Sequence, residues 1–141
     1  MKEASDDSDV VLGGFTLSKK EEIDSVKGGS VNYQSPEILQ QSNINTKSDM
    51  WSFGVCCFLF LTGKLPFQDN NRMKRNLKIS KANYTIDTPI SDSAKNFVSS
   101  FLCADQNNRS SASDALKHKW ITEKASETQL ENVRSLFSKI N

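Results

Sequence analysis

Two glycine-containing stretches in the first third of the chain bear most directly on chemistry. They are VVLGGFTLSKK at residues 10–20 and GGSVNYQSPEIL at residues 28–39. The first is typical of a short apolar strand that runs into a loop at Gly13 and Gly14. Glycine has no side-chain oxygen, whereas a hard cation such as Mg²⁺ requires carboxylates and other oxygen ligands. The loop therefore lacks the side chains that a magnesium site requires.

The other residue types that commonly carry chemistry do not form a recognisable site. Cys56, Cys57 and Cys103 lie in apolar contexts without the CxxC spacing of a zinc site, and the single histidine is His118. An odd number of such cysteines favours reduced thiols. We therefore expect no metal site and no disulfide framework, and a cytoplasmic protein, with the nucleus as a second compartment.

Composition excludes several classes of partner. The 141 residues carry a formal net charge of +1, with acidic and basic residues interspersed, so we expect no binding to nucleic acid. The N-terminus MKEASDDSDV lacks the apolar core of a signal peptide. The longest apolar run, residues 50–61, is too short to span a bilayer. These features predict a soluble, single-domain protein without a membrane span.

The elements that must position these stretches are mainly helical. Residues 46–62 are apolar around the whole circumference of a helix, and Gly63 is a suitable stop. Such a helix must be surrounded by protein. An earlier, shorter helix is expected to begin at Pro36, which suits the first helical position, with Ser35 as its cap.

Further helices follow the central one. We expect a weak basic helix at residues 70–79 and a capping box formed by Ser111 and Asp114. A polar linker at 122–128 leads to an amphipathic tail helix at 128–140, for which packing onto the body is the default role. One more helix has a single apolar face, made of residues Ala94, Phe97, Val98, Phe101 and Leu102.

These segments, in this order, resemble the second half of a eukaryotic protein kinase domain. Residues 28–39 are similar to the end of the activation segment, residues 48–67 to the central helix of the C-lobe, and residues 90–121 to its closing helices. The match covers residues 10–121 and most resembles the calcium/calmodulin-dependent kinase group. It implies a mainly α fold, the helical C-lobe of a kinase with a short N-terminal strand and an activation-segment loop.

The resemblance implies structural roles for four residues. Glu37 and Arg109 fall on the positions of a buried ion pair that locks the substrate-binding segment onto the lobe. Asp49 matches a residue whose carboxylate accepts backbone donors from the catalytic loop, and Trp51 packs in the core. Removing one partner of a buried ion pair costs on the order of 3–5 kcal/mol. We expect these residues to hold the segment in place.

The same resemblance assigns the segment that receives the substrate. Ser30, Tyr33, Pro36 and Glu37 match it, although Ser30 replaces the usual threonine, which puts ordinary substrate docking in doubt. Ser25 and Ser30 are candidate phosphorylation sites, because activation loops are ordered by phosphorylation.

The loop at residues 13–18 matches the Asp-Phe-Gly motif in a degenerate form. Gly14 stands where the metal-binding aspartate is expected, Phe15 keeps the apolar anchor, and Thr16 replaces the flexible glycine. Loss of the carboxylate forfeits several kcal/mol of charge stabilisation. The β-branched Thr16 also stiffens the hinge. We therefore expect a pseudokinase-like site without a bound metal.

The expected organisation is a polar segment at 1–9, a partial kinase-like domain at 10–121, and a linker with a tail helix at 122–141. The sequence contains no glycine-rich phosphate loop, strand lysine or His-Arg-Asp motif of the kind that a complete kinase uses. We therefore expect a chain truncated to the C-lobe and without catalytic residues. It would bind neither ATP nor Mg²⁺ unless a full kinase domain exists.

Two functions remain open on this basis. The first is a truncated, inactive Ser/Thr kinase-like protein that acts as a protein-interaction or regulatory module. Its partner protein would cover the exposed side of the central apolar helix, because uncovered apolar surface costs roughly 25 cal/mol per Å². The alternative is a fragment, or an incomplete sequence, of an ATP-dependent Ser/Thr kinase of the calcium/calmodulin-dependent type.

Overall fold

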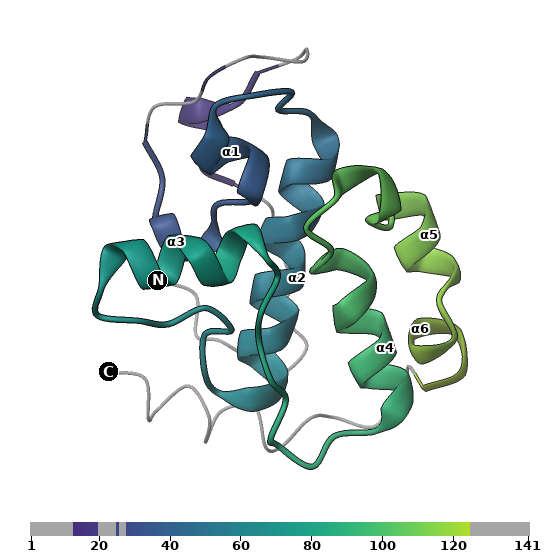
Figure 1. Cartoon of the computed structure of the whole chain (residues 1–141). Helices are drawn as coiled ribbons and strands as arrows, with labels where there is room; N and C mark the ends of the chain where they lie inside the picture. Colours follow the sequence, from purple (N-terminus) through teal and green to yellow (C-terminus); the bar gives the residue numbers. More distant parts are fainter. Residues whose placement is uncertain (1–12, 20–24, 26–27, 125–141) are drawn as a thin grey trace, which may run out of the picture.

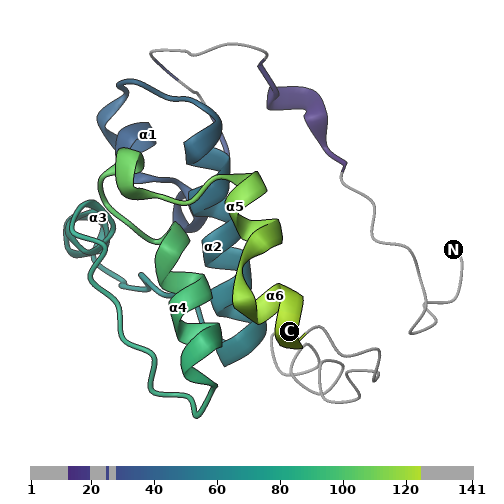
Figure 2. The same cartoon turned by 90° about the vertical axis from the view of Figure 1, so that its right-hand side faces the viewer.

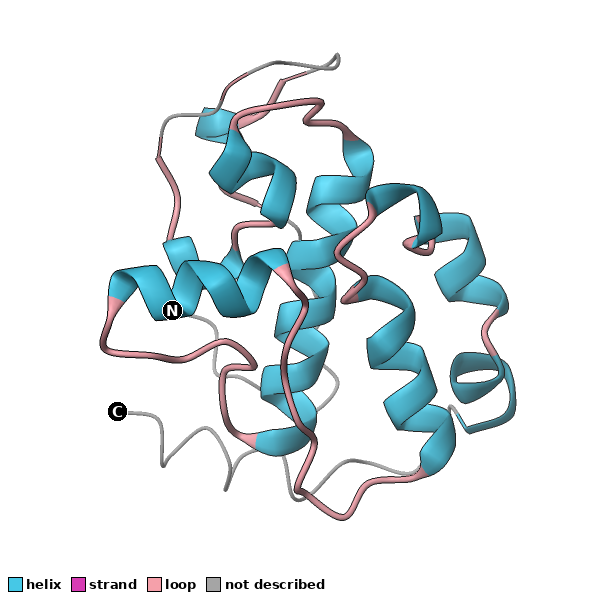
Figure 3. Cartoon of the chain, viewed as in Figure 1, coloured by secondary structure: helices cyan, strands magenta, loops and turns pink. Residues whose placement is uncertain are grey.

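The computed structural model describes residues 13–19, 25 and 28–124, and these form a mainly helical body (Figure 1). Figure 3 shows helices joined by loops, without a strand in the described part of the chain. The α-helices are α1 (Pro36–Gln40), α2 (Thr46–Thr62), α3 (Arg72–Ser80), α4 (Asp92–Phe101), α5 (Ala112–Lys117) and α6 (Lys119–Lys124). Short 3-10 helices lie at Phe15–Leu17, Val31–Tyr33 and Gln106–Asn108.

Helix α2 is the centre of the body, as its sequence predicts. It begins after Asn45, whose side chain accepts a hydrogen bond from the Lys47 amide, and ends at Gly63 in the left-handed region (φ 71°). Apolar residues lie on all sides of the helix, which therefore has no single buried stripe. In Figure 1, α3 crosses in front of α2 and α4 runs along it.

Helix α4 packs closely against α2. The predicted apolar face is confirmed, since every member is buried: Ala94, Phe97, Val98, Phe101 and Leu102. The contact is so tight at Gly54 that a Cβ built there would lie 2.7 Å from the Cβ of Phe101. Glycine is therefore required at this crossing for steric reasons.

Aromatic side chains join α2 to the segments that follow it. Trp51 stacks on Phe67 with ring centroids 5.1 Å apart, and Tyr84 meets both Phe67 and Phe58 edge-on at 5.7 Å. Such pairs add to the burial of apolar area. They hold the loop after α2 and the extended segment after α3 onto one core.

The predicted helix caps are confirmed at α5 but not at α1. Ser111 and Asp114 form the predicted capping box at the start of α5, which lies directly above α6 in Figure 2. Ser35 does not cap α1 through its side chain, because its hydroxyl is buried without a hydrogen-bond partner among the described residues.

Helix α6 continues to Lys124, so residues 122–124 are helical rather than linker. The predicted strand at 10–12 and the tail helix at 128–140 lie outside the described residues.

Candidate functional site

The centre of the candidate site is a buried ion pair between α1 and the loop before α5. The Arg109 guanidinium contacts the Glu37 carboxylate in a bidentate arrangement, with Nη1 2.7 Å from Oε1 and Nη2 3.1 Å from Oε2. The Ser48 hydroxyl donates a third hydrogen bond to Oε1 at 2.7 Å. The two residues are 72 positions apart in the sequence, so the pair closes a long loop.

The ion pair has almost no access to solvent. Glu37 is 6% exposed and Arg109 1% exposed, and the guanidinium carbon lies 5.1 Å from the centroid of the Trp51 ring. Burial raises the pKa of Glu37, but hydrogen bonds from Arg109 and Ser48 outweigh it, so the net pKa lies below the ordinary value. The glutamate is therefore ionised at neutral pH, and its charge is matched.

Sequence reasoning missed the partners that complete this pair. Arg109 also donates to the backbone carbonyl oxygens of Lys47 (2.6 Å) and Cys103 (3.0 Å), and the Lys47 ammonium group donates to the Arg109 carbonyl. Every residue has a backbone carbonyl, so the sequence does not reveal which carbonyls accept these hydrogen bonds. The hydroxyl of Ser48 at the start of α2 was the one partner of the ion pair that residue type could have suggested.

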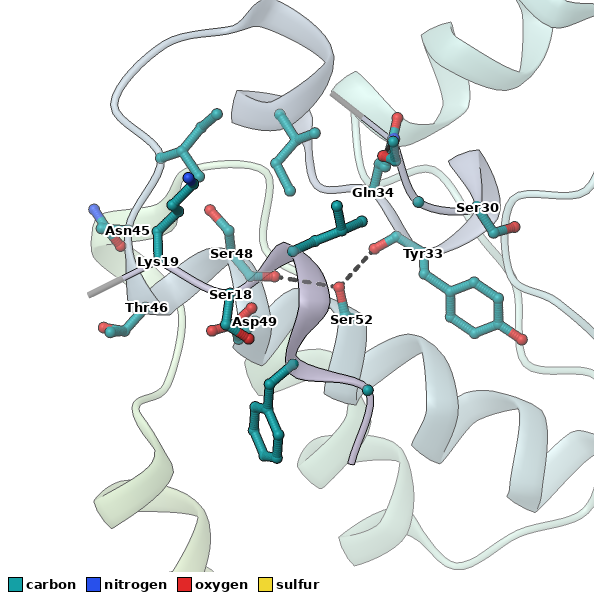
Figure 4. Close-up of a pocket in the computed structure, with 17 residues that line it drawn as sticks. Ser18, Lys19, Ser30, Tyr33, Gln34, Asn45, Thr46, Ser48, Asp49 and Ser52 are labelled. Carbon is teal, nitrogen blue, oxygen red and sulfur yellow. Dashed lines mark hydrogen bonds between the residues drawn. The ribbon is translucent and has the colours of Figure 1, made fainter. Parts of the chain in front are cut away.

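A hollow of about 830 Å³ lies between the loop at residues 13–19 and the start of α2 (Figure 4). Its wall contains the hydroxyl side chains of Ser48 and Ser52 on α2 and, opposite them, Tyr33. The Ser52 hydroxyl is within hydrogen-bond distance of the carbonyl oxygens of Tyr33 (2.8 Å) and Ser48 (3.4 Å). This hydrogen bond joins the segment that contains Tyr33 to the central helix α2.

The loop at residues 13–19 supplies no carboxylate for a magnesium ion at this hollow. Gly14 adopts a left-handed conformation (φ 78°) in open space, and it offers no side-chain oxygen. Among the described residues that line the hollow, Asp49 has the one carboxylate. Mg²⁺ is held by one or two carboxylates together with substrate phosphates. Nor do the described residues contain a group of three His, Cys, Asp or Glu side chains arranged for a metal.

The other two residues of the degenerate motif lie at the surface. Phe15 is 61% exposed, so its expected role as an apolar anchor is not seen in the described contacts. It belongs to a 3-10 turn that contains no buried residue. Thr16, in the same turn, is exposed as well.

The remaining predicted residues occupy varied environments. Pro36 is buried at the first position of α1, and Tyr33 is half-buried. Ser25 and Ser30 are both exposed. Asp49 is also exposed in the first turn of α2 and makes no side-chain hydrogen bond to another described residue. The structure thus brings Glu37 and Arg109 together, whereas Asp49 lies on the open side of the hollow.

No helix in the described part of the chain is long and apolar enough to cross a membrane. Trp51 is fully buried in the core, as the sequence suggests.

Comparison with known proteins identifies the family. Residues 5–121 match the family model for the protein kinase domain. The chain is 37% identical over 123 residues to calcium/calmodulin-dependent protein kinase type 1 of Caenorhabditis elegans, covering 83% of the chain and 35% of that protein. It is 42% identical over 134 residues to a calcium and calcium/calmodulin-dependent serine/threonine-protein kinase of Pisum sativum, covering 89% of the chain and 25% of that protein.

A third relative is calcium/calmodulin-dependent protein kinase type 1 of Macrobrachium nipponense, 35% identical over 139 residues, which cover 94% of the chain and 40% of the relative. The chain therefore spans about a quarter to two-fifths of the length of these curated relatives. With a mainly helical body and a matching family model over most of its length, the chain belongs to the eukaryotic protein kinase domain family, in the calcium/calmodulin-dependent group.

Proposed function

We propose that the protein is a Ser/Thr kinase-like protein without phosphotransfer activity, which acts as a protein-interaction or regulatory module. The observation that carries this proposal is Gly14, which puts no oxygen at the position where the family register expects a metal-binding carboxylate. Phosphoryl transfer depends on neutralising phosphate charge with such a metal. ATP and Mg²⁺ have a role here only if a full kinase domain exists.

The contacts expected to support a substrate-binding segment are present, although the loop at residues 13–18 is altered. The buried pair of Glu37 and Arg109 supports a segment held firmly against α2. Exposed Ser30 supports a role for this segment as a modified or recognised surface. A rigid segment of this kind is suited to binding a protein without reacting with it.

The exposed side of α2 is the surface we assign to a partner protein. Phe53 is 42% exposed and Phe60 50% exposed, and Cys56 lies between them on the same helical face. Co-purification of the protein with a partner that protects this face tests the assignment. The free thiols of the described cysteines support a reducing compartment, the cytoplasm or the nucleus.

The test is a phosphotransfer assay on the protein in its full natural length, with Mg²⁺, ATP and a peptide substrate. We expect no transfer above the enzyme-free blank. If the natural protein contains a full kinase domain, the Gly14→Asp variant should gain activity. A Cβ at either position meets nothing within 4 Å, but Gly14 has a left-handed backbone (φ 78°) that strains an added side chain. The control for added charge and bulk in the same loop is Gly13→Asp. It should gain nothing.

The alternative is an ATP-dependent Ser/Thr kinase, which the printed names of the relatives favour. Brisk transfer by the unmodified protein would establish it and contradict the proposed inactivity. In that outcome the metal would be held by groups other than residue 14.

A further inference from the structure

Helix α3 (Arg72–Ser80) presents exposed apolar side chains in a strongly basic setting. Met73 is 81% exposed and Leu77 54% exposed, and they lie one helical turn apart. Residues 72–81 contain five basic residues and no acidic one, although the whole chain has a formal net charge of only +1. Basic and apolar character thus coincide on one short helix.

A hollow of about 260 Å³ lies beside this helix. The residues around it are Asp69, Lys74, Leu77, Lys78, Lys81 and Asn83. Lys78 is already engaged, since its ammonium group contacts the Asp69 carboxylate at 3.0 Å and donates to the Gln68 carbonyl at 3.1 Å. Lys74 and Lys81 are exposed and form no ion pair with a described residue, so their charges face outward.

We propose that this α3 surface, made of Met73, Lys74, Leu77 and Lys81, binds an acidic peptide segment of another protein that carries bulky apolar side chains. The lysines attract carboxylates of the partner, and a side chain of the partner enters the hollow beside Leu77. Exposed apolar groups framed by charge are typical of an interaction surface. This surface is separate from the exposed side of α2 and does not depend on whether the protein transfers phosphate.

An anionic lipid surface fits these features less well than a peptide. Helices that lie in a membrane interface carry a broad apolar face with Trp, Phe or Leu. Helix α3 exposes one methionine and one leucine, and no aromatic residue. The hollow, about 260 Å³, can admit a bulky side chain of a peptide.

Fluorescence anisotropy of the 141-residue chain tests the proposal. The probe is a fluorescein-labelled peptide of glutamates with two leucines placed one helical turn apart. We expect saturable binding that weakens as NaCl is raised, since salt screens exposed charges. The Lys74→Glu/Lys81→Glu variant should bind about tenfold more weakly, and Met73→Ser/Leu77→Ser should show a similar loss.

Lys119→Glu is a single charge-reversal control, because Lys119 is exposed at the start of α6, which lies away from α3 in Figure 1. It should bind like the unmodified chain, and far-UV circular dichroism should be the same for all variants. Chemical-shift changes in the unmodified chain should centre on α3. Absence of binding, equal loss in the Lys119→Glu control, or binding to phosphatidylserine vesicles in place of the peptide would overturn the proposal.

Discussion

Arg109 uses every donor of its guanidinium group within the protein. Its five N–H groups are matched by the Glu37 carboxylate and by the carbonyl oxygens of Lys47 and Cys103. Replacement of one charge alone leaves the other buried and unpaired, which is far more costly than the loss of an exposed pair. At the scale of single residues, we expect this pair to hold α1 against the body.

The Arg109→Met substitution should lower the free energy of unfolding by about 3–5 kcal/mol, because Glu37 would remain charged and buried. The Glu37→Leu/Arg109→Met double variant should lose less than the single variant. Urea unfolding measures both. Lys78→Met, which breaks the exposed pair with Asp69, is the control and should cost at most about 1 kcal/mol. Equal losses for Arg109→Met and Lys78→Met would show that the buried pair contributes no more to the free energy of unfolding than the Lys78–Asp69 pair.

Acid should weaken the protein through Glu37. The pKa of this group is lower in the folded than in the unfolded state, so its stabilisation is complete above the unfolded value of about 4.3. It declines as pH falls through that value and is lost below the folded pKa. Chemical unfolding across acidic pH should therefore show a steep fall in stability, shallower in Glu37→Gln. The same slope in both proteins would contradict this assignment.

At the scale of elements, the position of α4 on α2 depends on Gly54. Helix propensity alone would favour alanine at such a position by about 1 kcal/mol. The tight approach of Phe101 reverses this preference. In such close packing, a single added methyl group changes the stability of the protein.

Gly54→Ala should therefore destabilise the protein by about 1–3 kcal/mol, because the added methyl group would have to push α4 away. Thermal unfolding by calorimetry provides the measurement. Ser99→Ala, on the exposed face of α4, is the control and should change stability by at most about 0.5 kcal/mol. A stabilised Gly54→Ala protein would show that the helices are not in close contact there.

The elements were predictable from sequence where the signal was local. The all-round apolar character of residues 46–62, the spacing within Ala94–Leu102 and the Ser111–Asp114 box each predict their element correctly. Local signals failed where tertiary contacts decide. The Ser35 side chain is buried instead of capping α1. Phe15, which the family resemblance assigns as an apolar anchor, is mostly exposed in the described body. The backbone acceptors around Arg109 are invisible to any sequence pattern.

At the scale of the whole molecule, the described body buries one side of α2 and leaves another open. Phe53 touches Phe97 and Phe101 edge-on, yet its ring is still 42% exposed. Phe60 is half-exposed on the same face. A cluster of large apolar side chains at a protein surface is typical of an interaction site or a cause of aggregation.

The 141-residue chain alone should therefore self-associate at high concentration, and Phe53→Gln/Phe60→Gln should do so less. Sedimentation velocity over a concentration series measures this. Leu116→Gln is the control, since Leu116 is an exposed apolar residue on a different helix, α5, and it should leave association unchanged. A monodisperse, cooperatively melting monomer at high concentration would argue against an uncovered face on α2.

Magnesium-dependent nucleotide binding by the protein in its full natural length tests the central claim most directly. Isothermal titration should detect no ATP binding that depends on Mg²⁺, because Gly14 offers the metal no side-chain oxygen. The Gly14→Asp variant should gain a dependence on Mg²⁺, while Gly13→Asp should not. Tight, Mg²⁺-dependent binding of ATP by the unmodified protein would contradict the account.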